Sequence, residues 1–451
     1  MNDLHALLAR RVAEERPLRV GLIGAGKFGT MFLAQARRVK GLHVVGVADL
    51  APERARLALE RAGWSKEQYT APSLAAALQH GTTFIGDDAP ALIAADGIEV
   101  IVEATGAPAA GVAHCLMAIE HHRHIVMVNV EADALLGPFL ARRAAEAGVV
   151  YSLAYGDQPA LIAEQVEWAR ACGFEVICAG KGTRYLPHYH QSTPETVWQY
   201  YGLSAEQAAA GGMNPQMFNS FLDGTKSAIE MAAVANACLL RPQPHGLAFP
   251  PCGVDDLPHV LRPREAGGQL AHAGTVEVVS SLERDGRPVF RDLRWGVYVV
   301  FAAPDDYVRR CFAEYGLVTD ASGTYSALYR PSHLIGLELP ISVLRVGLRQ
   351  EPTGYPQAFL GDVVAVAKRD LIEGETLDGE GGYTVYGKLM PAADSVALGA
   401  LPIGLAHNIR TLRPIPAGAV VRWDDVAYET NHPTVRLRRL MERTMLTETS
   451  Q

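Results

Sequence analysis

Three glycines placed directly after a strand-like segment constrain the fold of this chain more than any other feature. Residues 18–23 are apolar enough to form a buried strand, and Gly24, Gly26 and Gly29 follow at once. A helical run and a second apolar strand come next, and that strand ends in Asp49. This order of strand, turn, helix and strand, with glycines at this spacing, predicts a βαβ unit that binds a dinucleotide. The alternative is a turn in which the glycines serve only the backbone.

Each residue of the turn has a physical task under the first interpretation. We expect Gly24 to form the tight turn and Gly26 to let the backbone approach a pyrophosphate. Gly29 should let the helix pack closely on the strand, with the helix N-terminus facing the phosphates. Asp49 can accept hydrogen bonds from ribose hydroxyls, a contact that favours NAD. The predicted cofactor-binding residues of this unit are Gly24, Gly26, Lys27, Phe28, Gly29 and Asp49.

Small and polar residues follow the later strands of the same region. Thr105 and Gly106 come after the strand-like residues 98–102, and Asn129 follows the strand at 125–128. Ligands of parallel sheets bind outside the carboxyl ends of the strands, so we expect these three residues near the nicotinamide. The alternation of β and α segments predicts an α/β fold with a doubly wound parallel sheet, a Rossmann domain.

Composition and charge favour a globular enzyme. The chain has 451 residues, of which 49% are hydrophobic and 20% charged, enough for two or three domains with substantial cores. The formal net charge of -8 argues against a nucleic-acid partner. No apolar run approaches the ~20 residues that a membrane helix needs, so we expect no membrane partner. The six cysteines form no C-x-x-C pair, which is typical of reduced thiols in a cytoplasmic protein.

A second glycine-rich segment lies in the middle of the chain. Lys181 stands between Gly180 and Gly182, and Thr183 and Arg184 follow. Two cations, a hydroxyl and exposed backbone N–H groups at this spacing suit an anionic ligand, either phosphate or carboxylate. The alternative is a solvent-exposed loop with mixed polar residues.

Other charged residues are candidates for holding a substrate. Lys226 lies in the first turn of a predicted helix, where the helix dipole disfavours a cation, so its charge indicates a functional role. Arg330 and His333 precede an apolar, helix-like run.

From about residue 357, short strands with Gly and Pro turns predict a small β-rich domain with a charged helical tail.

Together these motifs carry a resemblance that spans nearly the whole chain. The C-terminal segment resembles a SAF domain, and the chain resembles homoserine-dehydrogenase-like oxidoreductases that carry one. Within them it is most similar to the 1-deoxy-D-xylulose 5-phosphate reductoisomerase-like (DXR-like) family. The motifs that carry this resemblance are residues 24–29, 103–106, 129–133, 156–157, 180–182, 224–226, 330–333 and 367–370.

The resemblance implies three domains and a cofactor. A Rossmann domain is expected at 1–155, an α+β catalytic and dimerisation domain at 156–356, and a SAF-like domain with a C-terminal helix at 357–451. It further implies NADP or NAD, and a homodimer or higher homo-oligomer. One departure argues against homoserine as the substrate, because Lys226 stands where homoserine dehydrogenases have an aspartate and Glu230 where they have a lysine.

These observations lead to one functional hypothesis. The chain is expected to be an NAD(P)-dependent oxidoreductase acting on a small polar hydroxy or keto substrate with an anionic group, such as 1-deoxy-D-xylulose 5-phosphate. Lys181 would donate a proton to the carbonyl oxygen, since a desolvated lysine near a second cation has a lowered pKa. Lys226 and Arg330 would hold the anionic end. The further predicted substrate contacts are Thr183, Arg184 and His333.

Two carboxylates have a predicted role in the reaction, and three alternative functions stay open. Glu131 and Asp157 would either bind Mg²⁺ or Mn²⁺ that polarises the carbonyl, or orient Lys181. The alternatives are a homoserine-type or sugar-acid dehydrogenase, a non-catalytic NAD(P)-binding sensor whose SAF domain binds a sugar, and a lyase or dehydratase.

Overall fold

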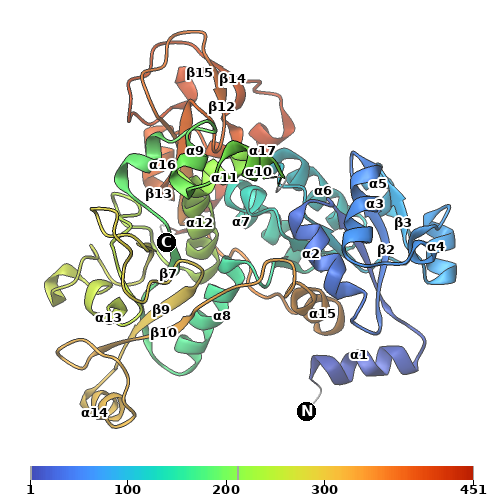
Figure 1. Cartoon of the computed structure of the whole chain (residues 1–451), viewed down its shortest axis with the longest axis horizontal. Coiled ribbons are helices and arrows are strands. Elements are labelled where there is room, and N and C mark those ends of the chain that lie inside the picture. Colours follow the sequence, from blue (N-terminus) through green and yellow to red (C-terminus); the bar gives the residue numbers. More distant parts are fainter. Residues whose placement is uncertain (1–2, 211–212, 450–451) are drawn as a thin grey trace. The chain divides into compact units, whose positions relative to one another are not determined.

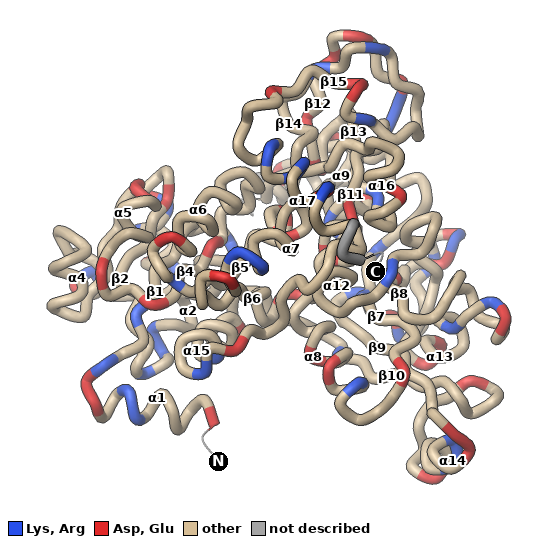
Figure 2. The backbone as a smooth tube through the Cα atoms, turned by 180° about the vertical axis from the view of Figure 1, so that it is seen from behind, with Lys and Arg blue, Asp and Glu red and all other residues tan. Residues whose placement is uncertain are grey.

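The computed structural model describes residues 3–210 and 213–449, which fall into two compact units. Unit 1 comprises Met1–Leu161 and His333–Gln357. Unit 2 comprises Ile162–Ser332 and Ala358–Gln451. The chain therefore leaves unit 1, returns to it for one short segment, and leaves it again. Figure 2 shows basic and acidic residues interspersed along the backbone of each unit.

Unit 1 is built on a six-stranded parallel sheet with the strand order β3-β2-β1-β4-β5-β6. Figure 1 labels its strands β2 and β3. This order is typical of dinucleotide-binding folds, in which the ligand lies where the order reverses, between β1 and β4. The strands are nearly continuous apolar runs because helices cover both faces of such a sheet. They are β1 (Leu18–Ile23), β2 (Leu42–Ala48), β3 (Phe84–Gly86), β4 (Val100–Glu103), β5 (His124–Met127) and β6 (Tyr151–Leu153). The predicted α/β fold with a doubly wound parallel sheet is confirmed.

Helices alternate with these strands along the chain. They are α1 (Leu4–Ala13), α2 (Lys27–Ala36), α3 (Pro52–Arg61), η1 (Lys66–Tyr69), α4 (Leu74–His80), α5 (Ala89–Ala94), α6 (Pro108–Glu120) and α7 (Val130–Glu146). The next helix, α8 (Gln158–Ala171), begins in unit 1 and continues into unit 2.

The short second segment of unit 1 completes the core of the sheet. Its helix α15 (Pro340–Arg349) contributes Val343 and Val346 to the apolar cluster formed by β1, β2 and α2. The Tyr155 N–H donates a hydrogen bond to Ser342 Oγ over 2.8 Å, which fixes the helix against the end of β6. Burial of these side chains explains why a segment far along the sequence belongs to unit 1.

Unit 2 contains a four-stranded mixed sheet with the order β10-β9-β7-β8. The strands are β7 (Glu175–Thr183), β8 (Thr275–Ser280), β9 (Val297–Ala302) and β10 (Tyr325–Arg330). Between and around them lie η2 (Pro187–Gln191), α9 (Val197–Tyr201), α10 (Ala205–Ala210), α11 (Pro215–Leu222), α12 (Thr225–Cys238), α13 (Leu257–Val260), η3 (Arg264–Ala266) and α14 (Asp306–Glu314). α12 packs on β7 and β8 and is buried on nearly all sides.

The C-terminal part of unit 2 is rich in short strands, as predicted. β11 pairs with β13, and β14 lies between β12 and β15. The elements are β11 (Gly361–Ala367), β12 (Thr376–Asp378), β13 (Val385–Pro391), α16 (Ala392–Leu398), η4 (Ile403–Leu405), β14 (His407–Thr411), η5 (Trp423–Asp425), β15 (Val426–Ala427) and α17 (Pro433–Thr449). Among all described residues, no helix combines the length and the apolar character needed to cross a bilayer.

Candidate active site

The turn after β1 has the geometry expected of a dinucleotide-binding loop. Gly24 adopts a φ of +97°, and a Cβ atom there would lie 2.5 Å from the Ala104 carbonyl oxygen. A Cβ atom at Gly29 would lie 2.4 Å from the Gly24 carbonyl oxygen. Both contacts are shorter than any real Cβ contact, so only glycine permits this turn to close against β4 and α2.

Gly26 differs from the other two glycines because the space beside it is open. It is the N-cap of α2, is exposed, and a Cβ atom there would have no other atom within 4 Å. The N-terminus of α2 therefore presents free space to a ligand, and helix N-termini attract anions. Exposed Lys27 opens the helix, while Phe28 packs against the core of unit 1. This arrangement fits a pyrophosphate group.

Asp49 lies at the end of β2, next to this turn. Its Oδ2 accepts from the Ala25 N–H over 2.9 Å, and its Oδ1 accepts from the Ala51 N–H over 2.9 Å. The Arg54 guanidinium donates to both oxygens, with Nη2 2.6 Å from Oδ1. Burial raises the pKa of the carboxyl, but these hydrogen bonds outweigh it and lower the pKa overall. Asp49 is therefore a charged, nearly buried anchor whose partner Arg54 keeps 59% of its side chain exposed.

A hydrogen-bond network joins the ends of β4 and β5 beside the same turn. Glu103 is fully buried, and its Oε1 accepts from Thr105 Oγ over 2.6 Å and contacts His114 Nδ1 at 3.2 Å. Asn129 Nδ2 donates to Thr105 Oγ over 3.2 Å, and Gly106 has open space around its Cα. The structure thus brings together the three predicted nicotinamide residues, Thr105, Gly106 and Asn129, on a loop that Glu103 holds in place.

The two carboxylates predicted to bind a metal lie at the starts of two helices, and no third protein ligand is grouped with them among the described residues. Glu131 lies in the first turn of α7 and Asp157 directly before α8, where its Oδ1 accepts from the Gln158 N–H over 2.9 Å. Within the described ranges, no three His, Cys, Asp or Glu side chains are grouped so that they could share an ion. We therefore derive no step through a metal.

A different carboxylate of α7 has an unusual environment. Asp133 is fully buried, and its Oδ1 accepts a hydrogen bond from the Tyr151 hydroxyl over 2.7 Å. Burial raises the pKa of Asp133 to about 7, and burial and the neighbouring Asp133 raise that of Tyr151 further above its ordinary value. The group is thus a carboxylic acid that is partly neutral near neutral pH.

In unit 2, Lys181 forms a buried ion pair. Its Nζ contacts Glu230 Oε2 of α12, and the two side chains are 5% and 2% exposed. The group that faces Lys181 is therefore a carboxylate, not the second cation expected from the sequence. The pair joins the inner strand β7 to the buried helix α12.

The segment around Lys181 is a strand, and the prediction of exposed backbone N–H groups there is wrong. β7 continues to Thr183 and pairs with β8 and β9 on its two sides. A Cβ atom at Gly180 would lie 1.8 Å from the Glu277 carbonyl oxygen, and one at Gly182 would lie 2.0 Å from that of Leu293. These glycines allow close packing of backbone, and their N–H groups are not arranged around an anion.

The other predicted substrate residues lie on several different elements. Lys226 lies in the first turn of α12 and is partly buried. Thr183 ends β7 and Arg184 follows it, with its Nε buried without a hydrogen-bond partner among the described residues. Arg330 ends β10 in unit 2, whereas His333 opens the second segment of unit 1.

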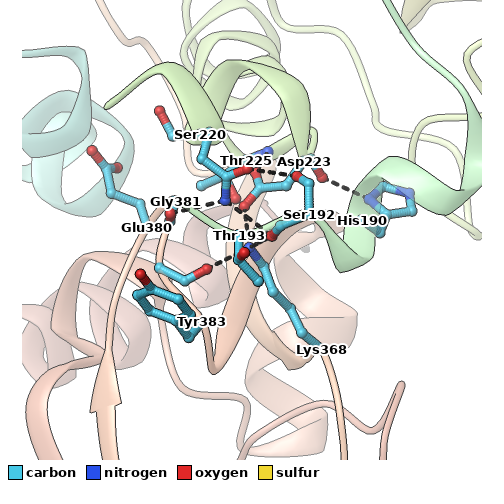
Figure 3. A network of polar contacts seen from close by, with 12 residues as sticks. His190, Ser192, Thr193, Ser220, Asp223, Thr225, Lys368, Glu380, Gly381 and Tyr383 are labelled. Atoms are coloured by element: carbon cyan, nitrogen blue, oxygen red, sulfur yellow. Dashed lines mark hydrogen bonds and ion pairs between the residues drawn. The ribbon is translucent and has the colours of Figure 1, made fainter. Parts of the chain in front are cut away.

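A second buried ion pair explains the sequence motif around Lys368 (Figure 3). Lys368 Nζ lies 2.7 Å from Asp223 Oδ2 and donates to the carbonyl oxygens of Ser192 and Gly382, each over 2.7 Å. Asn219 Nδ2 donates to the carbonyl oxygens of Ser192 and Gly381 over 3.0 and 2.9 Å. The ion pair and these hydrogen bonds are buried, so the network fastens the C-terminal strands to α11 and α12.

Comparison with known proteins agrees with this architecture. Residues 156–339 match the family model described as "Oxidoreductase DRL, catalytic domain". No curated protein matches the chain. The matched family model describes an oxidoreductase, which agrees with the geometry of the glycine turn in unit 1. The matched residues end before β11, so the resemblance of the C-terminal segment to a SAF domain stays a prediction.

Several solved structures are similar to the chain at low identity. Myo-inositol dehydrogenase from Lactobacillus casei in complex with NAD(H) and myo-inositol is 16% identical over 40% of this chain and 50% of that enzyme, with a TM-score of 0.28. A probable dehydrogenase from Thermotoga maritima is 12% identical over 74% of this chain and 90% of that one, with a TM-score of 0.37. An oxidoreductase from Agrobacterium radiobacter in complex with NAD+, L-tartaric acid and magnesium is 18% identical over 46% and 54%, with a TM-score of 0.27. The chain spans about half the length of the first and third proteins, and likenesses this low carry no conclusion about ligands.

Sequence reasoning missed the partners of the predicted residues. The pattern gave no sign of Arg54, which lies in the first turn of α3, five residues after the acid at the end of β2. Glu103 was noted only as part of a motif, although a charged residue that ends an apolar strand is a signal of a functional network. The contact between Lys181 and Glu230 joins residues 49 positions apart, and no local pattern could reveal it.

Proposed function

We propose that the chain binds NADP(H) or NAD(H) at the turn of unit 1 and reduces or oxidises a small hydroxy or keto substrate with an anionic group. The observation that carries the proposal is the open N-terminus of α2 at Gly26, flanked by two glycines that no other residue could replace. The pyrophosphate would lie at Gly26 and Lys27, and the nicotinamide side at Thr105, Gly106 and Asn129. The bound nicotinamide supplies the hydride chemistry.

The contacts of Asp49 favour NADP(H) over NAD(H). Both carboxylate oxygens already accept from Arg54, so a ribose 2′-hydroxyl would have to compete with a guanidinium for them. A 2′-phosphate would instead meet the exposed side of Arg54, and arginine binds phosphate well because its donors form a planar fork. We expect Arg54→Ala to weaken NADPH binding about tenfold and NADH binding little, measured by nicotinamide fluorescence. Equal effects on both cofactors would contradict this assignment.

The proton of the reaction is assigned to Lys181. A nearly buried lysine that faces a carboxylate can donate a proton and take one back with little movement of its side chain. Glu230 holds the charged form in place. Arg184 is proposed to hold the anionic end of the substrate, since its buried Nε has no hydrogen-bond partner among the described residues. Lys226, Arg330, Thr183 and His333 stay predicted contacts of the same group. A second copy of the chain stays the predicted partner.

The substrate can be tested by absorbance at the reduced-nicotinamide band. We would incubate the protein with NADPH or NADH and 1-deoxy-D-xylulose 5-phosphate, with and without Mg²⁺, and then with homoserine, sugar acids and polyol phosphates. Oxidation or reduction of the cofactor with any of these supports the proposal and names the substrate class. Product formed without any change in nicotinamide absorbance would overturn it and favour a lyase.

The role of Lys181 needs a variant that keeps its charge. Lys181→Arg leaves a cation opposite Glu230, but a guanidinium does not release a proton near neutral pH. We expect turnover to fall at least about 100-fold, the lower range for the loss of a general acid. Cofactor affinity and thermal unfolding should stay close to those of the wild type. Turnover that survives in Lys181→Arg would rule out the assigned role.

A further inference from the structure

A cleft in unit 2 lies on a different face of α12 from the Lys181–Glu230 pair. Its volume is about 220 Å³, and it is lined by the start of α12, by the loop at residues 245–249 and by β13. Ala228 lines the cleft, whereas Glu230 contacts Lys181. Residues two positions apart in a helix do not face each other. The cleft is therefore separate from the pair to which we assign proton transfer.

One side of the cleft is a continuous wall of aromatic rings. Tyr386 stacks on His190 with ring centroids 4.5 Å apart and an interplanar angle of 24°. Phe249 stacks on Tyr185 with centroids 4.0 Å apart and an angle of 16°. Tyr185 and His190 are joined by a hydrogen bond of 2.9 Å between the hydroxyl and Nε2. The rings of His190, Phe249 and Tyr386 all line the cleft.

The backbone at Phe249 is strained to place its ring in this wall. Its φ is +51°, a left-handed conformation that is rare for a bulky residue and costs about 1–3 kcal/mol. The Phe249 N–H donates to Glu277 Oε1 over 3.2 Å, and the Ala248 N–H donates to the same carboxylate over 3.0 Å. Buried Glu277 thus holds the loop, and the Gly387 N–H, bonded to Thr225 Oγ over 2.8 Å, holds β13 against α12. A strained backbone that holds a ring in a fixed wall favours a binding role over a purely structural one.

The charge of the cleft is positive. His190 Nδ1 lies 2.7 Å from the Asp223 carbonyl oxygen, which only accepts, so Nδ1 carries the proton and donates. Burial lowers the pKa of His190 and keeps the imidazole neutral. The nearby Asp223 carboxylate is neutralised by Lys368. This leaves Lys388, whose ammonium forms no ion pair within residues 3–210 and 213–449.

No acidic residue is among those described as lining the cleft, and exposed His245 adds a second nitrogen at its edge. A neutral ring wall, an unpaired lysine and a helix N-terminus together suit an anion with a flat apolar body, because rings stack on rings and a carboxylate pairs with an ammonium. A hydrated inorganic anion would leave the wall unused. A neutral aromatic compound would leave the charge of Lys388 unused.

We propose that this cleft is a second ligand site, which binds a small planar organic carboxylate with its ring against His190, Phe249 and Tyr386 and its carboxylate at Lys388. The site does not depend on the cofactor or on Lys181. Its ligand is therefore expected to bind the full-length protein in the presence and in the absence of NADPH with similar affinity.

The test uses three probes in calorimetric titrations of the full chain. Benzoate carries both the ring and the charge, inorganic phosphate carries the charge alone, and benzamide carries the ring alone. We expect saturable binding of benzoate and binding at least tenfold weaker for the other two. Phosphate binding as tightly as benzoate would overturn the role of the wall, and benzamide binding as tightly would overturn the role of Lys388. An absence of benzoate binding would overturn the proposal as a whole.

Two variants and a matched control locate the binding. Lys388→Gln and Phe249→Leu should each weaken benzoate binding at least tenfold, while NADPH binding stays unchanged. Lys66→Gln makes the same charge change at an exposed lysine of η1 and should leave benzoate binding unchanged. Thermal unfolding of each variant shows whether it folds. Benzoate binding that is equal in Lys388→Gln and Lys66→Gln would place the ligand elsewhere and contradict the proposal.

Discussion

The two glycine-rich segments of this chain look alike in sequence and differ in what surrounds them. In unit 1 the middle glycine, Gly26, faces open space, whereas in unit 2 the backbone of β8 and of the residue Leu293 fills the space beside Gly180 and Gly182. The first segment leaves room for a ligand, and the second uses the absence of side chains to bring strands and loops together. Glycine spacing alone therefore does not distinguish a ligand cradle from close packing, and the setting of the segment decides.

The largest expected effect breaks the packing role of the second segment. In Gly180→Ala the new Cβ atom would meet the Glu277 carbonyl oxygen at 1.8 Å, and backbone on both sides of β7 cannot yield cheaply. We expect the free energy of unfolding to fall by at least about 4 kcal/mol, the range in which point substitutions are exceptional. Urea unfolding followed by circular dichroism measures the change. A loss below about 1 kcal/mol would show that the segment is a loop after all.

The next effect concerns the lysine between these glycines. Lys181→Ala leaves Glu230 buried without its cation, and removal of one partner of a buried pair costs about 3–5 kcal/mol. We expect a loss of about 3 kcal/mol in urea unfolding. The double variant Lys181→Met/Glu230→Leu replaces the pair by apolar side chains and should recover most of that stability while remaining inactive. Activity in the double variant would contradict the chemical role of the pair.

A third prediction uses a buried acid of unit 1. The pKa of Asp133 is about 7 in the folded state, which is above its pKa in the unfolded chain. At a pH between these two pKa values the folded state therefore binds a proton that the unfolded state has released. Stability contributed by the protonated acid is present at low pH and is lost as the pH rises toward 7. In the wild type the free energy of unfolding should drop between pH 5 and pH 8. We expect this drop to be smaller in Asp133→Asn by on the order of 2 kcal/mol. Parallel pH profiles for variant and wild type would contradict this.

The smallest effect on stability is expected at the first segment. Gly26 has a φ of -69°, which alanine adopts easily, and there is nothing for a Cβ atom to touch. Gly26→Ala should leave the unfolding free energy unchanged or raise it by about 0.4–1 kcal/mol, because alanine has less freedom in the unfolded chain. A clear loss of stability would show that Gly26 is a packing glycine like Gly180.

The sequence was sufficient to predict features that depend on residues close to one another along the chain. The spacing of Gly24, Gly26 and Gly29 after an apolar strand was sufficient to predict the tight turn between β1 and α2, since each glycine acts within a few residues of the others. The loop with Thr105 and the residue Asn129 followed from the rule that polar residues gather at the carboxyl ends of parallel strands.

Other features depend on contacts that the sequence does not show. Gly180 and Gly182 have low strand propensity, and they lie in β7 only because β8 and β9 pair with it on both sides. The return of α15 to unit 1 rests on burial of Val343 and Val346 in a core made by residues about 300 positions earlier. The metal predicted from Glu131 and Asp157 stays a prediction, because the sequence shows residue types but not which side chains are grouped in space, and no group of three ligands occurs among the described residues.

The most direct test of the contrast between the two segments is a titration of NADPH followed by nicotinamide fluorescence, with wild type and Gly26→Ala side by side. The account predicts saturable binding by the wild type and binding at least tenfold weaker by the variant, with equal thermal unfolding of both. Equal affinities in the two proteins would contradict the claim that the open N-terminus of α2 holds the cofactor.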